Sequence, residues 1–237
     1  MQQSDLIIAV FEFVLLIFSL CVHECAHAWM ASRLGDQTAR MEGRITLNPM
    51  VHVDPIGTLL FPALMVFGPF IHLSFFGGML VGWAKPTPVI TRNFRRIVRD
   101  DNLTTLAGPA SNLLLVLAAL LILVIDVKVV PNGNRVVVDS FIASLAPDEG
   151  VTPQPLVLLC ALTILINLSL CVFNLFPIPP LDGSRLVRNM LPYNAVQVYD
   201  RIPIWVSYLL MIFVGGTVIW AFVNPALELV LRVLARV

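Results

Sequence analysis

Four long apolar runs constrain this chain more than any other feature. They cover residues 5–33, 103–125, 154–176 and 204–223. A helix of about 20 apolar residues crosses the hydrocarbon core of a bilayer, so each run is predicted to be a membrane span. Composition agrees, because 58% of the residues are hydrophobic and only 13% are charged, against about 25% charged in ordinary soluble domains. The sequence therefore predicts an integral, multi-pass membrane protein.

Charge and cysteine content argue against two other classes of protein. Lysine plus arginine and aspartate plus glutamate number 15 each, so no net field favours nucleic acid as a partner. The four cysteines lie in or beside apolar runs without a CxxC pair, so no disulfide framework is expected. Without a visible repeat or soluble domain, residues 1–237 are interpreted as one membrane-embedded domain, with its core at 5–183 and helical segments at 204–237.

Ionisable residues stand at the end of the first apolar run. The stretch CVHECAHAW (21–29) holds His23, Glu24 and His27 in the pattern HExxH, in which two imidazoles four residues apart share a metal ion. On an ideal helix, His27 lies about 40° and Glu24 about 100° from His23 around the axis, so one face presents all three. The alternative, two histidines bonded to neighbouring helices, leaves Glu24 as a costly charge without a partner in the membrane.

A metal shared by two histidines needs a third protein ligand if one position is to stay open for water. The best candidate is Asp182, in the stretch NLFPIPPLDG (174–183) that follows the third apolar run. Its prolines prevent a regular helix, so the backbone there must line protein or water. The competing interpretation is an ordinary turn, for which LDG is suitable chemistry, and this stretch alone favours the turn.

Together, the two stretches resemble the site-2 protease family of intramembrane zinc metalloproteases. Further pieces are similar to that family's motifs and follow its order: GRITLNPMVHVDPIG (43–57), GWAKPTPV (82–89), LAGPASN (106–112) and FNLFPIPPLDG (173–183). The resemblance implies one zinc ion per chain, held by His23, His27 and Asp182. It implies that Glu24 is the general base and that Asn174 helps to hold the substrate carbonyl. The chain looks like a minimal member, without the PDZ and CBS modules of some relatives.

The resemblance also implies what the protein acts on. Relatives hydrolyse peptide bonds within or near membrane segments, so the expected partners are a transmembrane protein or a signal-peptide-like segment and the lipid bilayer. Two other classes stay open: a metal transporter, which should stage its ligands along a pathway, and a catalytically inactive zinc-binding protein, which should have lost a ligand or the base. All four positions of HExxH and LDG are filled, which favours a protease.

A substrate helix hides its peptide bonds, so the protease must hold its substrate unwound. Residues 43–54 alternate apolar and polar positions around Asn48-Pro49, which predicts a short membrane-associated β-hairpin. Its open edge is suited to adding the substrate as a strand. His52 is interpreted either as a residue near the metal or as a hydrogen bond that fixes this loop. Residues 128–141 are interpreted either as a second, exposed hairpin that turns at Asn132-Gly133 or as a simple loop.

The remaining apolar segment, 58–82, is interrupted by Pro62, Gly68-Pro69 and Gly77-Gly78. Such breaks are poor in a lipid-facing span, so a re-entrant loop is predicted, and HExxH and LDG then meet on one side. Most basic residues fall on that side, which makes it cytoplasmic and the N-terminus external. The predicted fold is an all-α, polytopic membrane helix bundle with a short β-hairpin and a re-entrant loop, and the minimal architecture favours a prokaryotic cell membrane. Glu12, on the helical phase of His23, is expected to face the bundle interior as part of a water path or as a buried acid.

Overall fold

The computed structural model describes residues 3–71, 84–146 and 152–237, and this part of the chain contains only helices, turns and loops. Four of its helices are long and apolar enough to cross a membrane: Leu6–Leu34, Ile97–Val129, Pro155–Asn174 and Ile204–Arg236. They match the four predicted spans. In chain order the helices are α1 (Gln3–Leu34), α2 (Thr38–Met41), α3 (Pro49–His52), η1 (Pro55–Leu60), α4 (Phe61–Phe67), η2 (Gly68–Ile71), η4 (Thr91–Asn93), α5 (Ile97–Val129), α6 (Gly133–Leu145), α7 (Pro155–Asn174), α8 (Asp182–Met190), α9 (Tyr193–Tyr199), α10 (Ile204–Leu210), η5 (Met211–Gly215) and α11 (Gly216–Arg236).

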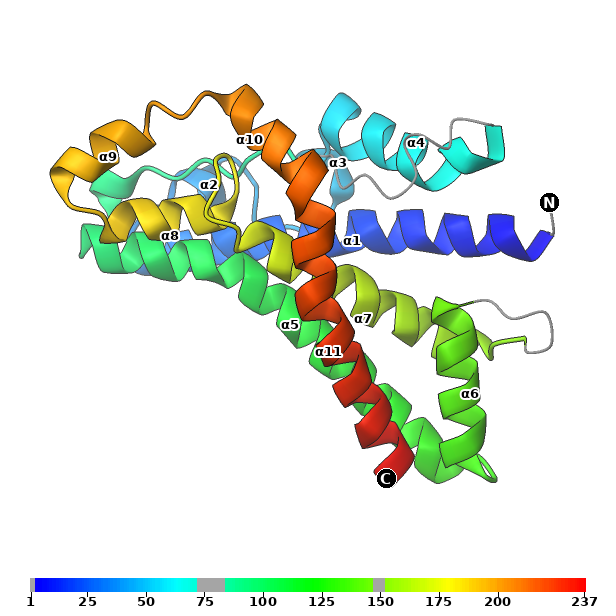
Figure 1. The fold of residues 1–237 in the computed structure, drawn as a ribbon. Coiled ribbons are helices and arrows are strands. Elements are labelled where there is room, and N and C mark those ends of the chain that lie inside the picture. Colours follow the sequence, from blue (N-terminus) through cyan, green and yellow to red (C-terminus); the bar gives the residue numbers. More distant parts are fainter. Residues whose placement is uncertain (1–2, 72–83, 147–151) are drawn as a thin grey trace.

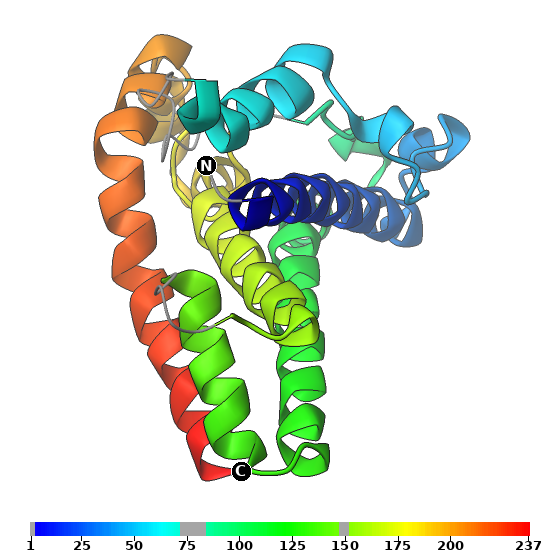
Figure 2. The ribbon, with the colours of Figure 1, turned by 90° about the vertical axis from the view of Figure 1, so that its right-hand side faces the viewer.

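Helix α5 organises the bundle, because both α1 and α7 pack along it. Its second half lies with α6, α7 and α11 at the end that carries the C-terminus (Figures 1 and 2). The buried apolar core is concentrated there and includes Leu123, Phe141, Val157 and Val223. The first half of α5 instead packs against α1 and α8, where the buried residues are largely polar. The apolar core and the candidate site therefore occupy different ends of α5.

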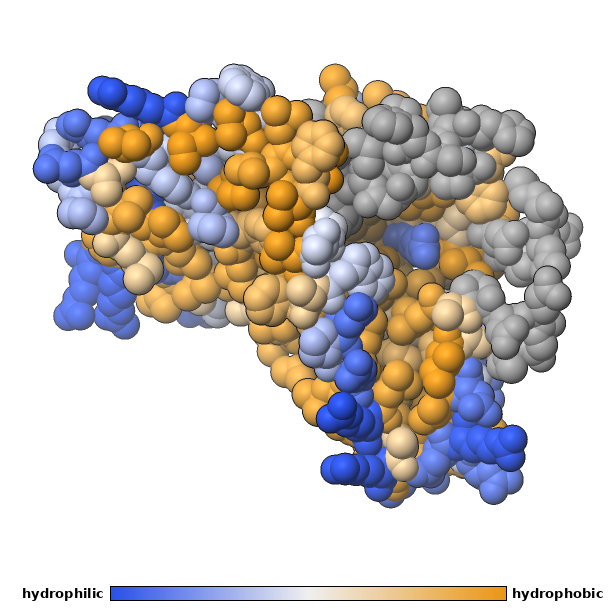
Figure 3. All heavy atoms as spheres, viewed as in Figure 1, coloured by the Kyte–Doolittle hydropathy of each residue, from blue (hydrophilic) through white to orange (hydrophobic). Residues whose placement is uncertain are grey.

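The surface has the pattern of a membrane protein. Figure 3 shows hydrophilic residues gathered at the end that carries α8 and α9 and at the end that carries the C-terminus, with hydrophobic surface between them. Large apolar side chains on the outside of the spans, such as Leu114, Leu121 and Phe213, are more than half exposed. Such exposure is costly in water but suits contact with lipid.

The prediction of a β-hairpin at 43–54 is wrong. Residues 43–48 form an irregular loop, and the chain then enters the short helix α3. Asn48 caps this helix by accepting a hydrogen bond from the Met50 amide at 3.1 Å, and Pro49 takes the first helical position, where its missing N–H costs nothing. Asn-Pro is thus a helix start and not a hairpin turn, so no open strand edge forms here.

His52 belongs to the structure of this loop. Its side chain is 1% exposed, and its Nε2–H donates to the Thr46 carbonyl at 2.9 Å. Arg44 adds a second tie, because its guanidinium donates to the Val51 carbonyl at 2.7 Å. Of the two interpretations of His52, the structure supports the one in which a hydrogen bond fixes the loop.

The expected hairpin at 128–141 is also wrong. The turn lies where the sequence indicates, since Asn132 adopts a left-handed conformation with a φ of 55°, but it joins α5 to α6. Val137 and Phe141, four residues apart on α6, are fully buried, so the apolar positions follow the period of a helix. An Asn-Gly pair can supply a left-handed residue to the turn between two strands or to the turn between two helices, so it does not distinguish them.

Two residues that flank the segment predicted to be re-entrant lie side by side. The Lys85 amide, which follows the segment, donates to the carbonyl of His52, which precedes it, at 2.9 Å. Between these two residues, Pro55–Phe67 is apolar but shorter than a span. Residues 72–83 lie outside the described residues, and the prediction for 58–82 falls partly on them.

Candidate active site

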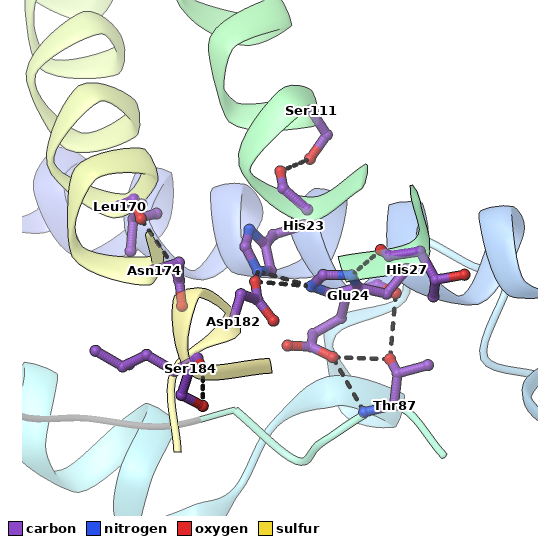
Figure 4. Close-up of polar contacts among 12 residues, drawn as sticks. His23, Glu24, His27, Thr87, Ser111, Leu170, Asn174, Asp182 and Ser184 are labelled. Atoms are coloured by element: carbon purple, nitrogen blue, oxygen red, sulfur yellow. Dashed lines mark hydrogen bonds and ion pairs between the residues drawn. The ribbon is translucent and has the colours of Figure 1, made fainter. Parts of the chain in front are cut away.

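The ligand residues predicted from the sequence converge. His23 and His27 lie one turn apart on α1, and Asp182 is the first residue of α8. Asp182 Oδ2 lies 3.1 Å from His23 Nε2 and 3.2 Å from His27 Nε2, and the two Nε2 atoms are 3.0 Å apart. Figure 4 shows the three side chains pointing toward one another. Both histidines are buried, so the cluster is closed to bulk water on most sides.

This donor set fits a zinc ion. Zinc binds imidazole nitrogen and carboxylate oxygen at about 2.0–2.2 Å with tetrahedral angles, which places two ligand atoms about 3.3 Å apart. The separations found here, 3.0–3.2 Å, are close to that value. Burial opposes the charged carboxylate, but its contacts with the His23 and His27 imidazoles hold the pKa of Asp182 well below its ordinary value. An ionised carboxylate is what a metal ligand must be.

Helix α5 orients one imidazole and packs against both. The Nδ1–H of His27 donates to the Thr104 carbonyl at 2.7 Å, which fixes the tautomer and leaves Nε2 free for a metal. One turn further along α5, Gly108 lies directly against the rings. A Cβ at Gly108 would lie 2.6 Å from His23 Nε2 and closer still to His27 Nε2, so only glycine fits. Gly108 stands inside the stretch LAGPASN (106–112), but the sequence does not indicate which side chains a helical glycine faces.

Glu24 occupies the adjoining position on α1 and is half-buried. Its Oε2 accepts two hydrogen bonds from Thr87, from the amide at 3.1 Å and from the hydroxyl at 2.7 Å. The same hydroxyl lies 3.2 Å from the Glu24 carbonyl oxygen. The carboxylate is therefore held beside the ligand cluster without belonging to it. Like Gly108, Thr87 has a contact with the site that its sequence motif, GWAKPTPV (82–89), does not indicate.

Helix α8 is fastened to α5 along the face that carries Asp182. Arg185, one turn after Asp182, forms an ion pair with Asp101 at 2.5 Å. Asn189, two turns after Asp182, donates to the other oxygen of Asp101 at 2.7 Å. Asp101 is only 6% exposed, whereas the Arg185 side chain is partly exposed, and charge-assisted hydrogen bonds to a buried carboxylate fix geometry. These bonds set where α8 begins and so place the Asp182 carboxylate against α1.

The loop between α7 and α8 is close-packed. A side chain at Gly183 would collide with the backbone carbonyls of Leu175 and Phe176. Glycine is therefore required at this position because no Cβ fits there. Asn174, the last residue of α7, donates from Nδ2 to the Leu170 carbonyl at 2.9 Å. An amide nitrogen carries two hydrogens, so one donor remains for another partner. Glu12 is half-buried on α1, away from these residues.

Comparisons with known proteins agree with this arrangement. The chain matches the model of Peptidase family M50 over residues 11–215. It is similar to "Putative zinc metalloprotease YwhC" from Bacillus subtilis, with 31% identity over 94% of this chain and 90% of that protein. It is also similar to "Putative zinc metalloprotease Rip2" from Mycobacterium tuberculosis, with 30% identity over 87% of this chain and 70% of that protein. No solved structure matches the chain.

Proposed function

The chain belongs to peptidase family M50, and from that premise we propose which residues act and on what. It is an intramembrane zinc metalloprotease, which confirms the resemblance drawn from its motifs. His23, His27 and Asp182 hold the zinc ion, and Glu24 is the general base. The substrate is a transmembrane protein or a signal-peptide-like segment, cut within or near its membrane segment.

One observation carries the assignment of residues. Asp182 lies 159 positions after His23, yet its carboxylate meets both imidazoles of the HExxH motif within 4.8 Å. An aspartate that served only in a turn would not be expected to contact two histidines of a distant helix. Among residues 3–71, 84–146 and 152–237, this is the only cluster of three or more potential metal-binding side chains. A second cluster of this kind, which a metal transporter that stages its ligands along a pathway would use, is not found in that part of the chain, and this favours the protease.

The chemistry follows from the positions of the side chains. Zinc supplies Lewis acidity, which acidifies a water molecule and polarises the scissile carbonyl. Glu24, which stands beside the two histidine ligands on α1, would take the proton of the attacking water and return it to the leaving amine. Asn174 uses its free N–H to hold the carbonyl oxygen as charge develops on it; such a donor contributes about 10²–10³-fold in rate.

Removal of the metal tests this function. Purified protein in detergent is incubated with a panel of quenched fluorescent peptides, each containing one apolar segment of about 20 residues. Cleavage is expected to stop after treatment with a zinc chelator and to return when zinc is added, because the ligands hold a catalytic metal. Cleavage that persists at full rate in a verified zinc-free sample would contradict a metalloprotease.

We also propose that the active site faces the cytoplasm of a prokaryotic cell. Most of the 15 lysines and arginines stand on segments at the site end, whereas four, Lys128, Arg135, Arg232 and Arg236, stand near the C-terminus and the α5–α6 turn. The excess marks the cytoplasmic side. Bacterial relatives support the choice of a bacterial membrane.

Labelling of single cysteines tests this orientation. Arg92, on η4, and Arg135, on α6, are exposed, and the proposal places them on opposite sides of the membrane. Arg92→Cys and Arg135→Cys are each placed in a cysteine-free background. A membrane-impermeant maleimide added to intact cells is expected to label position 135 and to reach position 92 only after the cells are opened. Equal labelling of both positions in intact cells would refute the arrangement.

A further inference from the structure

Thr87 lies against the Glu24 carboxylate. Its amide and hydroxyl both donate to Glu24 Oε2, at 3.1 Å and 2.7 Å. In Figure 4 this oxygen is turned toward Thr87, while the other carboxylate oxygen points back toward Asp182. The two oxygens of Glu24 are therefore in different environments: one is anchored and the other faces the ligand cluster.

The sequence around Thr87 makes it a rigid donor. Thr87 stands between Pro86 and Pro88, and a residue that precedes proline is restricted to extended conformations. Proline also lacks an N–H, so Thr87 supplies the only amide hydrogen of these three residues. The segment is thus held extended before Glu24 binds to it, and the hydrogen bonds lose little to conformational entropy.

The segment is also fixed on both sides of Thr87. Two residues before it, the Lys85 amide donates to the His52 carbonyl at 2.9 Å. Three residues after it, the Ile90 amide donates to Asp36 at 2.7 Å, and the Asn93 side chain donates to the same carboxylate at 2.9 Å. Asp36 is fully buried just beyond the end of α1, so the helix that carries Glu24 also anchors the segment that carries Thr87.

We propose that Thr87 is a positioning residue for the general base. A glutamate side chain has three rotatable bonds, so an unanchored carboxylate samples several rotamers and loses entropy when it is fixed. By anchoring Oε2, Thr87 selects the rotamer in which the second oxygen faces the metal ligands and is available to take a proton. The inference rests on the proposed role of Glu24. It assigns Thr87 to the turnover step and not to substrate affinity or zinc binding.

The test compares three variants of full-length protein with the peptide that the wild type cleaves fastest. Thr87→Val keeps the shape of the side chain and removes the hydroxyl, whereas Thr87→Ser keeps the hydroxyl. Loss of a hydrogen-bond partner of a metal ligand typically costs about 10–100-fold in activity, and we expect a partner of the base to act at the low end of that scale because its amide hydrogen bond to Glu24 survives. The kcat of Thr87→Val should therefore fall about 10-fold. KM and zinc content should stay within about 2-fold of wild type, and Thr87→Ser should restore most of kcat. Thr91→Val, an exposed threonine four residues away, is the matched control and should behave as wild type.

Each other result overturns the inference. An unchanged kcat in Thr87→Val would show that the hydroxyl is not needed, and a loss that Thr87→Ser does not rescue would show that shape matters instead. A fall in zinc content or a rise in KM would indicate a structural or substrate-binding role. If Thr87→Val does not fold, as judged by size-exclusion chromatography, Thr87→Ala replaces it. Glu24→Gln, measured in parallel, separates two failures: its activity would refute the proposed base, whereas an inactive Glu24→Gln beside a fully active Thr87→Val would refute only the role of Thr87.

Discussion

Glu24→Gln is expected to abolish proteolysis while the zinc content stays near one ion per chain. Glutamine has the shape of glutamate and accepts the same hydrogen bonds from Thr87, whose donors lie at 2.7 Å and 3.1 Å from Glu24. Its amide, however, takes no proton from water at neutral pH. General base catalysis contributes about 10²–10⁴-fold, so peptide cleavage should fall by that factor. Metal analysis of the same sample gives the zinc content.

His23→Ala provides the contrasting variant. Because His23 is a proposed ligand, its loss should remove zinc as well as activity. Wild-type turnover in Glu24→Gln would refute the base, and loss of zinc from Glu24→Gln would move Glu24 from the base to the ligands. The two readouts together therefore separate proton transfer from metal binding within one helix face.

The parts of this protein that the sequence predicts well are set by local patterns. The four spans follow from runs of apolar residues that, as helices, are long enough to cross the hydrocarbon core of the bilayer. The HExxH face follows from the helical period, since His23 and His27 share a face of any straight helix. In both cases residues that are close in sequence are also close in space, so the local pattern alone predicts the structure.

The failures come from patterns that are local but ambiguous. Asn48-Pro49 and Asn132-Gly133 are turn signals for a hairpin, but the same residues begin a helix or join two helices. The difference lies in distant contacts: Val137 and Phe141 on α6 are buried in the helical core, and no strand pairs with residues 43–48 in the described part of the chain. A strand without a partner leaves its backbone groups unpaired, which a membrane protein avoids.

Residues whose roles depend on the tertiary fold could not be assigned beforehand. The stretch around Asp182 alone favours a turn, because the ion pair of Arg185 with Asp101 that fastens α8 to α5 joins residues far apart in the sequence. Thr87 and Gly108 stood inside quoted motifs, but a threonine between prolines or a glycine in a helix does not reveal what it faces. Their functions come from contacts with α1 across more than 60 residues of chain.

Gly108→Ala is expected to release zinc and abolish proteolysis, as Asp182→Ala should. A Cβ at this position would lie 2.6 Å from both Cε1 and Nε2 of His23, well inside van der Waals contact, so the rings or α5 must move. Such overpacking costs about 1–3 kcal/mol, and a displaced ligand should weaken zinc affinity by at least about 10-fold. Zinc content and peptide cleavage, measured after dialysis against a mild chelator, check this result.

Gly216→Ala is the matched control, because a Cβ there meets nothing within 4 Å. Alanine is a better helix former than glycine by about 1 kcal/mol, so on helix propensity alone both substitutions should stabilise the protein. Gly216→Ala should therefore keep its zinc, its activity and its thermal stability, and only Gly108→Ala should lose the metal. The difference between the two variants isolates the contact with the imidazoles from the effect of the helix. If Gly108→Ala binds zinc and cleaves peptide as well as Gly216→Ala does, α5 does not press on the ligands and the packing of the site described here is wrong.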